Sequence, residues 1–453
     1  MAAQSQAEIK CNDDLAKTTL KLHDGNSIPQ VALGTYLKSR AMKSFRSSNI
    51  KMSEEQIAKD KKEDEKEEKE FGNAIKVAIQ AGYRHIDTAQ VYRTEVVIGN
   101  ALQELYKDNI IKREELFLTT KIARNVRDPK EIRESIENSL KYLQTDYIDL
   151  MLIHSPHSQN RNGLKGHDVI ELYKILHEYR EKGKIKSVGV SNFGLKHLEI
   201  LEKSVPDLPI PVVNQIECHP FLQETEIIEY CQKKNILMES YSPIAQAVET
   251  VRNDQLLNKL AKKYNKTFSH IMLRWQIQRG FVLLPKSVTP KRIISNGDLF
   301  SFQLTEDEMK ELNGLKEEEL RICWNPLNVP WDDNYGTEEA EKIKNSDPVN
   351  EALKTTKIKL NDGIEIPQLG LGTFSYKHVF RFENAPEDKT ERKEPTEEEK
   401  EKLKQDDEKE KQQFKDAVIY ATKIGYRHID AAEIYRTQDV IGEALQELYK
   451  DGI

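Results

Sequence analysis

The sequence has few cysteines and no long hydrophobic segment. Its 453 residues include only four cysteines, spaced too widely for a CxxC metal or redox pair and too few for the disulfide framework of a secreted protein. No run approaches the roughly 18 apolar residues of a membrane span, and the start, MAAQSQAEIK, lacks the apolar core of a signal peptide. We therefore expect a cytoplasmic protein with no metal site and no membrane partner.

The chain also has no excess of basic residues. Lys and Arg number 69 against 76 Asp and Glu, a net charge of -7, and no basic tract is free of acids, which argues against a nucleic-acid partner. Charged residues make up 32% and hydrophobic residues 38%, so polar segments dilute an ordinary core. We therefore expect no nucleic-acid partner.

An internal repeat divides the sequence. GYRHIDTAQVYRT (82–94) returns as GYRHIDAAEIYRT (425–437), with ten of thirteen positions identical, and LHDGNSIPQVALGTY (22–36) pairs with LNDGIEIPQLGLGTF (360–374). We predict one full domain at 1–335, a linker at 336–356, and a truncated second copy of its first two βα units at 357–453.

Mixed-charge runs interrupt both copies, near 39–70 and near 381–413. Glu-to-Lys pairs four residues apart and the amphipathic segments that follow predict solvated helical extensions. A docking arm for another protein is the alternative.

Within the first domain, strand-like and helical patterns alternate. A hairpin is predicted around the Asp24-Gly25 turn. The predicted strands then cover 32–35, 85–87, 116–121, 148–154, 185–191, 212–217, 237–240 and 282–284. Eight strand–helix pairs at this length favour an α/β fold with a closed (β/α)8 TIM barrel, and no GxGxxG follows the first strand as a Rossmann domain would require.

The carboxyl ends of barrel strands form the active-site face, and here they are strongly polar. Asp87, Lys121 and His154 end three strands, and Tyr92 lies shortly after Asp87. A phenol with a pKa near 10 can donate a proton at neutral pH if a neighbouring cation stabilises its anion. Lys121 could be that cation, held by Asp87, with His154 orienting a carbonyl oxygen. None of these groups can deliver hydride, so a cofactor must.

These motifs resemble the aldo-keto reductase family over essentially the whole first domain. GYRHIDTAQVYRT, LFLTTKI (116–122) and DLMLIHSP (149–156) resemble the segments that carry its catalytic tetrad, which maps onto Asp87, Tyr92, Lys121 and His154. GVSNF, VVNQIE, SYSPIA and LLPKSVTPKRIISN resemble its cofactor-binding segments. The resemblance implies cofactor contacts from Gly34, Thr35, Ser191, Asn192, Gln215, Tyr241, Ser242, Lys286, Ser287, Arg292 and Asn296.

The resemblance implies NADPH, because Lys286 and Arg292 suit the 2′-phosphate of the ribose. Ser295 replaces a common Glu, Gln246 a common Ser, and Ser155 a common Trp. Tyr36 and Trp324 are the expected substrate contacts. HSP, NQIECHPFLQ and LRICWNP resemble a fungal branch that reduces α-keto amides and conjugated polyketones such as ketopantoyl lactone.

The resemblance implies an oxidoreductase, a monomer or weak dimer, that reduces small-molecule carbonyls to alcohols with NADPH. The reverse reaction is that of an NADP-dependent alcohol dehydrogenase. The alternatives are an NADPH-binding regulatory or scaffold protein on the same fold and a barrel that binds a sugar phosphate. The second copy keeps Asp430 and Tyr435 but has no counterpart of Lys121 or His154. It is expected to be a non-catalytic remnant, the product of an incomplete gene model, or a segment that swaps into a barrel.

Overall fold

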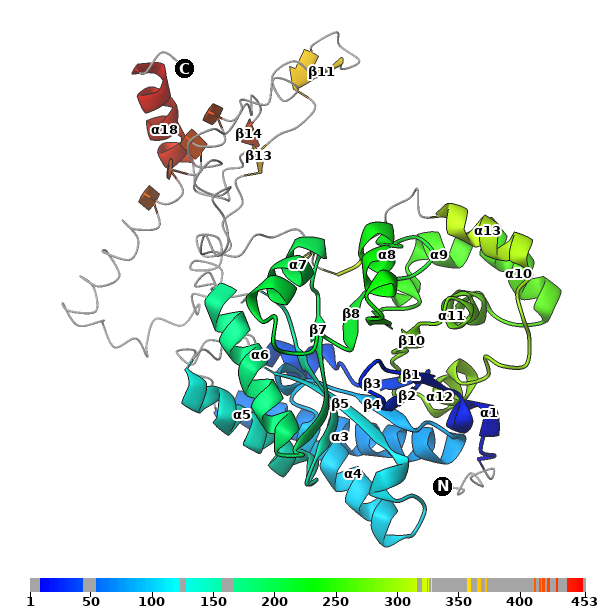
Figure 1. Cartoon of the computed structure of the whole chain (residues 1–453). Helices are drawn as coiled ribbons and strands as arrows, with labels where there is room; N and C mark the ends of the chain where they lie inside the picture. The colour runs from blue at the N-terminus through cyan, green and yellow to red at the C-terminus, as the bar shows by residue number, and fades with distance from the viewer. Residues whose placement is uncertain are drawn as a thin grey trace. The chain divides into compact units, whose positions relative to one another are not determined.

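A computed structural model describes most of the first domain and short pieces of the rest. The described residues are 9–43, 54–122, 128–156, 166–315, 320–323, 325, 327, 357–359, 365–367, 371–372, 411–412, 415–416, 418–419, 422–423, 429–430 and 438–450. The chain divides into two units, Met1–Gly336 and Thr337–Ile453 (Figure 1). Each is described by itself.

Eight parallel strands form the centre of the first unit and neighbour one another in chain order. They are β3 (Leu33–Gly34), β4 (His85–Asp87), β5 (Phe117–Ile122), β6 (Ile148–Ile153), β7 (Ile185–Ser191), β8 (Val213–Glu217), β9 (Leu237–Tyr241) and β10 (Val282–Leu283). Each predicted strand is confirmed, with ends that differ by at most one residue. Almost every residue in them is buried, as expected for strands covered on both faces.

The sheet closes on itself between its first and last strands. Leu283 N donates to Gln30 O at 2.9 Å, Ala32 N donates to Leu283 O at 2.8 Å, and Gly34 N donates to Pro285 O at 3.1 Å. Parallel bridges join Val31 to Leu283 and Gly34 to Lys286. The predicted (β/α)8 barrel is therefore confirmed.

The predicted hairpin is confirmed as β1 (Thr19–Lys21) and β2 (Ser27–Pro29), which pair antiparallel. Gly25 in its turn has φ +93°, a backbone conformation that glycine adopts without strain. A short helix, α1 (Asp13–Lys17), precedes the hairpin and was not predicted. Asn12 caps α1 by accepting from Leu15 N.

Helices lie outside the strands and cover the barrel (Figure 1). They are α2 (Lys38–Lys43), α3 (Glu54–Ala81), α4 (Glu95–Lys107), α5 (Pro129–Leu143), α6 (Gly166–Glu181), α7 (Leu195–Ser204), α8 (Thr225–Lys233), α9 (Glu249–Asn253), α10 (Gln255–Tyr264), α11 (Phe268–Gln278), α12 (Pro290–Asn296) and α13 (Glu306–Gly314), with 3-10 turns η1 (Gln90–Tyr92), η2 (Arg113–Glu115) and η3 (Ala245–Ala247). In α5, the apolar residues Ile132, Ile136, Leu140 and Leu143 recur at helical spacing and are all buried. No helix in the described part of the chain is long and apolar enough to span a membrane.

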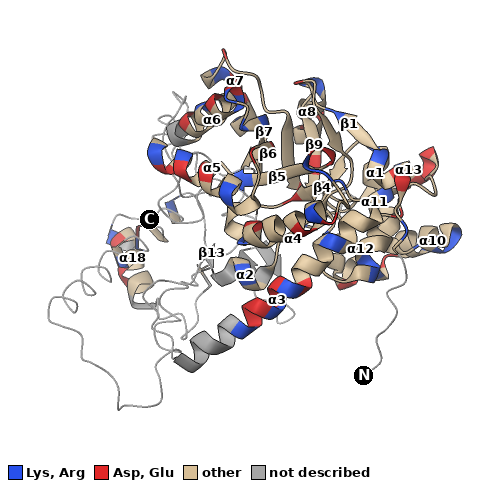
Figure 2. Cartoon of the chain, turned by 90° about the horizontal axis from the view of Figure 1, so that it is seen from below, with Lys and Arg blue, Asp and Glu red and all other residues tan. Residues whose placement is uncertain are grey.

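The mixed-charge run before Phe71 and the amphipathic segment after it form one helix, α3. Figure 2 shows basic and acidic residues following one another along the described part of α3 before Phe71. Arg40 of α2 donates to Glu68 at 2.7 Å and Ser39 donates to Glu67 at 2.5 Å, so α2 and α3 are joined by polar contacts. Phe71 and Ile75 then enter the core.

The second unit contains two strand pairs and a helix among its described residues. Strands β11 (Lys357–Lys359) and β12 (Glu365–Pro367) pair antiparallel, and β13 (Leu371–Gly372) pairs parallel with β14 (Ile429–Asp430). Gly372 lies opposite Asp430 in this pair, as Gly34 lies opposite Asp87 in the barrel. Val418 packs with Ile441 and Ala444 of the helix α18 (Gln438–Lys450).

Candidate active site

A buried ion pair lies at the centre of the barrel mouth. Lys121 of β5 donates from Nζ to Asp87 Oδ1 at 2.6 Å and to Thr88 O at 2.9 Å. The Lys121 side chain is fully buried and that of Asp87 is 4% exposed. Burial opposes the ammonium charge, but Asp87 and then Tyr92 favour it, so the pKa of Lys121 is raised above its ordinary value. Lys121 is therefore a fixed cation at neutral pH.

Tyr92 lies beside this cation, on the η1 turn that follows β4. Lys121 Nζ is 5.0 Å from the centre of its ring. The rings of Tyr92 and His154 meet edge to face with centres 5.6 Å apart, and Tyr36 meets Tyr92 in the same way at 5.2 Å. Gln90 fixes the turn by donating to Ser135 O and Ser139 Oγ of α5 at 3.0 and 2.9 Å. The structure thus brings together the four predicted catalytic residues and one predicted substrate contact.

Polar side chains at the ends of β7, β8 and β9 form a second group. Ser191 Oγ donates to Gln215 O at 2.9 Å, and Asn192 Nδ2 donates to His154 O at 2.9 Å. Tyr241 donates to Asn192 Oδ1 at 2.8 Å. Asn192 has φ +64°, a left-handed conformation that turns its amide back toward the strand ends. These predicted cofactor residues are therefore linked to His154 of the tetrad.

Lys286 and Gly34 lie side by side where the barrel closes. A Cβ at Gly34 would be 2.9 Å from Leu284 O and 3.4 Å from Lys286 Cβ, so no side chain fits here. Thr35 Oγ, next in the chain, donates to Asp87 O at 2.8 Å. Burial lowers the pKa of Lys286, and Glu67 only partly opposes this effect. An anion beside Lys286 would supply the missing counter-charge.

The rest of the predicted phosphate-binding segment lies on and before α12. Ser287 is buried, and its Oγ accepts from Thr289 N at 3.1 Å. Arg292 is exposed and Asn296 is half-buried. Tyr83 donates to Ile293 O at 2.9 Å, and His270 Nε2 contacts Ser295 O at 2.8 Å, so the core fixes this short helix. The described contacts join neither the Arg292 nor the Asn296 side chain to Lys286.

Glu217 at the end of β8 fastens the segment that follows α13. Its two carboxylate oxygens accept from Ile322 N at 2.7 Å and Cys323 N at 3.0 Å, and Arg321 lies 3.8 Å away. Ser242, a predicted cofactor residue, has its Oγ 3.5 Å from Cys323 Sγ. Trp324, the other predicted substrate contact, lies outside the described residues. The sequence places Glu217 at the end of a predicted strand but does not show which backbone groups it would hold.

Sequence reasoning missed Glu239, a carboxyl group inside the barrel. It lies in the middle of β9 and is fully buried. Gln215 Nε2 donates to Glu239 Oε2 at 2.7 Å and to Asp87 Oδ2 at 2.9 Å. Burial first, and then Asp87, raise the pKa of Glu239 to about 8. The available signal was an acidic residue in the middle of a predicted strand, LMESY.

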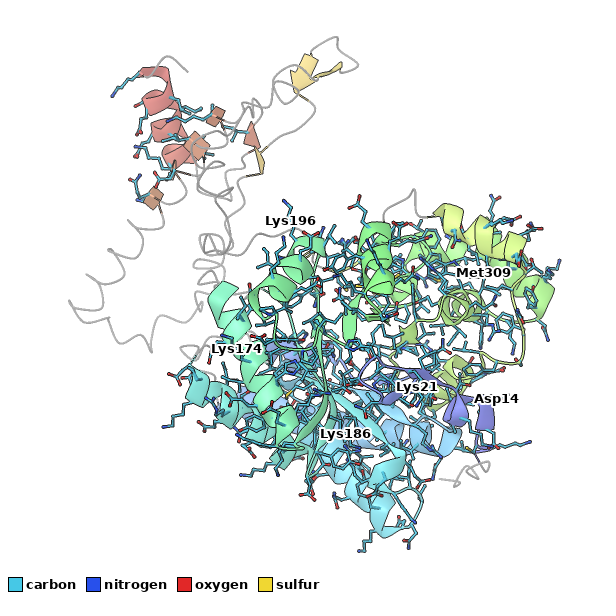
Figure 3. All side chains as sticks on the ribbon, viewed as in Figure 1. Asp14, Lys21, Lys174, Lys186, Lys196 and Met309 are labelled. Atoms are coloured by element: carbon cyan, nitrogen blue, oxygen red, sulfur yellow. The ribbon has the colours of Figure 1, made fainter. Side chains whose placement is uncertain are left out.

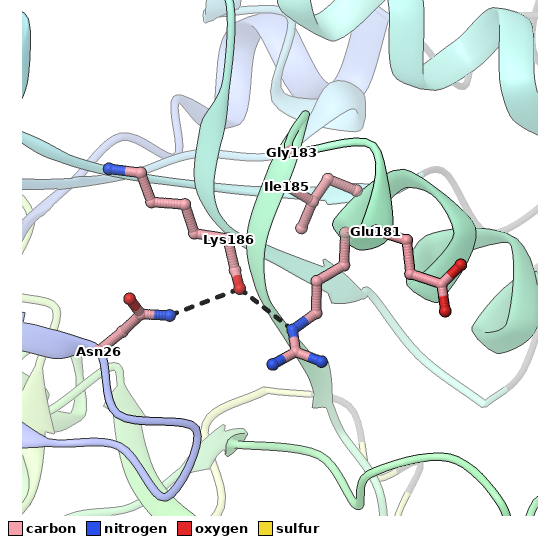
Figure 4. Close-up of a pocket in the computed structure, with 6 residues that line it drawn as sticks. Asn26, Glu181, Gly183, Ile185 and Lys186 are labelled. Atoms are coloured by element: carbon pink, nitrogen blue, oxygen red, sulfur yellow. Dashed lines mark hydrogen bonds between the residues drawn. The ribbon is translucent and has the colours of Figure 1, made fainter.

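The opposite end of the barrel carries charges that serve structure. Asp149 near the start of β6 accepts from Arg113 at 2.7 Å and from Lys186, labelled in Figure 3, at 3.1 Å. A pocket of about 420 Å³ lies beside it at the start of β7, where Asn26 and Arg180 donate to Lys186 O (Figure 4). Contacts at this end stabilise the barrel, whereas the reactive groups lie at the carboxyl ends of the strands.

Comparisons with known proteins agree with this geometry. The family model described as "Aldo/keto reductase family" matches residues 55–317. The chain belongs to the aldo/keto reductase family. It is 37% identical to an uncharacterized oxidoreductase of Schizosaccharomyces pombe over 69% of this chain and 98% of that protein. It is 35% identical to aldo-keto reductase family 1 member D1 of Mus musculus over 72% of this chain and 100% of that protein.

Solved structures of aldo/keto reductases resemble the first unit. A Bombyx mori aldo-keto reductase in complex with NADP is 34% identical, with a TM-score of 0.57, over 68% of this chain and 94% of that one. An aldo-keto reductase from a deep-sea metagenome library is also 34% identical, with a TM-score of 0.57, over 69% of this chain and 100% of that one. The family membership makes this chain an oxidoreductase on a (β/α)8 barrel.

Proposed function

We propose that the protein reduces carbonyl compounds to alcohols with NADPH and that Tyr92 is the proton donor. The observation that carries this proposal is the buried Lys121–Asp87 pair against the Tyr92 ring, with His154 on another side of that ring. Tyr92 donates its phenolic proton to the carbonyl oxygen as charge develops there. Lys121 stabilises the phenolate that remains, and Asp87 holds Lys121 in place.

His154 completes this arrangement by orienting the substrate. Its ring lies against Tyr92, and its backbone oxygen is held by Asn192. A hydrogen bond from the imidazole to the carbonyl oxygen would place that oxygen next to the phenol and favour negative charge on it.

The residues present fit a nicotinamide cofactor, which supplies the hydride when it is bound. Ser191, Asn192 and Gln215 would hold its carboxamide, and Tyr241 would lie against the nicotinamide ring. Lys286, Ser287 and Arg292 would hold a 2′-phosphate, and Asn296 the adenine. Burial lowers the pKa of Lys286, and this supports an anionic ligand beside its ammonium group.

For the substrate we propose α-keto amides or conjugated diketones such as ketopantoyl lactone. Ser155 follows His154 where a Trp is common, so that side of the pocket is more polar. Tyr36 is 45% exposed and contacts Tyr92, which supports its role as a substrate contact. A ketone next to a second carbonyl is electron-poor and accepts hydride readily.

We propose the cytoplasm as the place of action, and all four cysteines are free, as a reducing compartment would keep them. We also propose that residues 357–453, which repeat the opening of the first domain, do not hold a complete active site by themselves. No LTTKI or LIHSP motif recurs in it. Asp430 ends β14, whereas Tyr435 lies outside the described residues.

The proposal is tested by following oxidation of NADPH with isatin, ketopantoyl lactone, an α-keto amide, xylose and a simple aldehyde. Tyr92→Phe should lower kcat by about 10²–10⁴, the usual contribution of a general acid. Tyr435→Phe is the matched control and should leave turnover unchanged. NADPH binding without turnover of any carbonyl would instead favour a regulatory protein. Activity in Tyr92→Phe that disappears only when Tyr435 is also replaced would show that the second copy supplies the donor.

A further inference from the structure

Glu239 is a buried carboxyl group to which the proposed mechanism gives no role. It lies on β9, where its register neighbours are Gln215 on β8 and Val282 on β10. Its side chain is fully buried, and its Oε1 atom has no hydrogen-bond partner in the described part of the chain. Burying a carboxyl group in this position costs free energy unless the group is hydrogen-bonded, paired with a charge or protonated.

The contacts of Glu239 lead directly to the tetrad. Gln215 Nε2 donates one N–H to Glu239 Oε2 at 2.7 Å and the other to Asp87 Oδ2 at 2.9 Å. Asp87 Oδ1 in turn accepts from Lys121 at 2.6 Å. Both N–H bonds of the Gln215 amide are therefore used inside the protein. Its carbonyl oxygen is the part that stays available to a ligand.

We propose that Glu239 is a positioning residue of the nicotinamide site, which holds the Gln215 amide so that its carbonyl oxygen faces the cofactor. This inference rests on the proposed function, since Gln215 is proposed to hold the cofactor's carboxamide. That carboxamide has an NH2 group, which needs an acceptor. An acceptor at position 239 fixes the second N–H of Gln215 and so disfavours the flipped amide, which would present a donor to a donor.

The charges around Glu239 also tie it to the proton donor. Asp87 faces it from β4 and raises its pKa, Lys121 faces it from β5 and lowers it, and Val282 on β10 brings no charge. With a pKa of about 8, Glu239 is neutral at pH 7 and becomes an anion at alkaline pH. The new negative charge favours the ammonium of Lys121 and opposes the phenolate of Tyr92. Tyr92 therefore keeps its proton to a higher pH than it would beside a neutral group.

Two substitutions separate the roles of Glu239. Glu239→Gln keeps an oxygen that can accept from Gln215 and removes the titration, whereas Glu239→Leu removes the acceptor. Binding of NADPH and of 2′,5′-ADP, which lacks the nicotinamide half, is measured by calorimetry on the full chain at pH 7. We expect the dissociation constant for NADPH to stay within about twofold in Glu239→Gln and to rise about tenfold in Glu239→Leu. Binding of 2′,5′-ADP should be unchanged in both, which shows that the barrel is folded.

The pH profile of kcat for reduction gives a second measurement. Its alkaline limb should lie at lower pH in Glu239→Gln than in the original protein, because the anion that protects the Tyr92 proton is missing. A fixed profile in Glu239→Gln, or a Glu239→Leu variant that binds NADPH as tightly as the original protein, would overturn the inference and leave the proposed function standing. Failure of the original protein to bind NADPH would instead overturn the proposed function itself.

Discussion

Removing the Lys121 ammonium should destabilise the barrel as well as stop catalysis. Asp87 is 4% exposed, and Lys121 is its only cationic partner within 4.0 Å among the described residues. Lys121→Met leaves the Asp87 carboxylate buried, with the neutral Gln215 N–H as its remaining side-chain donor among the described residues. Leaving one charge of a buried pair uncompensated costs about 3–5 kcal/mol of unfolding free energy. Glu239, protonated at pH 7, adds no second charge that could complicate this expectation.

The double variant Lys121→Met/Asp87→Asn tests whether the cost comes from the charge. Asn is close in shape to Asp and carries no charge, so the double variant should recover about 2–3 kcal/mol relative to the sum of the single variants. Turnover should stay lost in both. Urea unfolding at pH 7, followed by tryptophan fluorescence, reports on the first unit, because Trp275, Trp324 and Trp331 all lie in it. Additive effects of the two substitutions would refute the reasoning.

Other changes probe the remaining parts of the molecule. Lys286→Met should weaken the binding of NADPH about tenfold or more and change the binding of NADH little, because only NADPH has the 2′-phosphate to which Lys286 would donate. Direct measurement of the two dissociation constants checks this. Glu217→Ala should raise KM more than it lowers kcat and speed proteolysis after Arg321, because Ile322 N and Cys323 N lose their acceptor. Gly99→Ala should destabilise the first unit by about 1–3 kcal/mol, because the added Cβ would lie 2.3 Å from Tyr142 O. Gly442→Ala in α18, where no described atom lies within 4 Å of the added Cβ, should instead stabilise that helix by about 0.5–1 kcal/mol. Hydrogen exchange can measure the change in helix stability. Between pH 4.5 and 8 the folded state holds a proton on Glu239 that the unfolded chain releases, so the free energy of unfolding should fall as pH rises through this window. Thermal melts of Glu239→Gln should show a smaller fall in stability over the same window.

The order of strands and helices could be predicted from the sequence because each element carries a local signal. The runs of β-branched and apolar residues gave all eight barrel strands, and the Asp24-Gly25 turn gave the hairpin. Helix α1 was missed because its five residues, DDLAK, are too short for a periodic apolar face. It is held instead by distant contacts, such as the hydrogen bond from Asn12 Nδ2 to Gly297 O.

The proximity of the four proposed catalytic residues could be predicted because each lies at a strand end or in the turn after one, and parallel strands bring their carboxyl ends together. Arg292 and Asn296 were predicted from resemblance alone. The structure places them on α12, but the described contacts give neither a partner in the cofactor site. Their roles depend on a ligand, and sequence patterns carry little information about side chains that only a ligand orders.

Glu239 could not be assigned a role from the sequence because its partners are far away along the chain. The sequence predicts a strand at 237–240, but only the closed barrel shows that the side chains of Glu239, Gln215 and Asp87 meet in its interior. Gln215 and Asp87 are separated by 128 positions, and the Gln215 amide bridges Asp87 and Glu239. Barrel curvature therefore decides which polar residues meet. The residues of the second unit cannot build this network by themselves. Strands β13 and β14 reproduce the Gly34–Asp87 pairing, but the network also needs side chains on counterparts of β5, β8 and β9. No motifs that match these strands occur among residues 357–453.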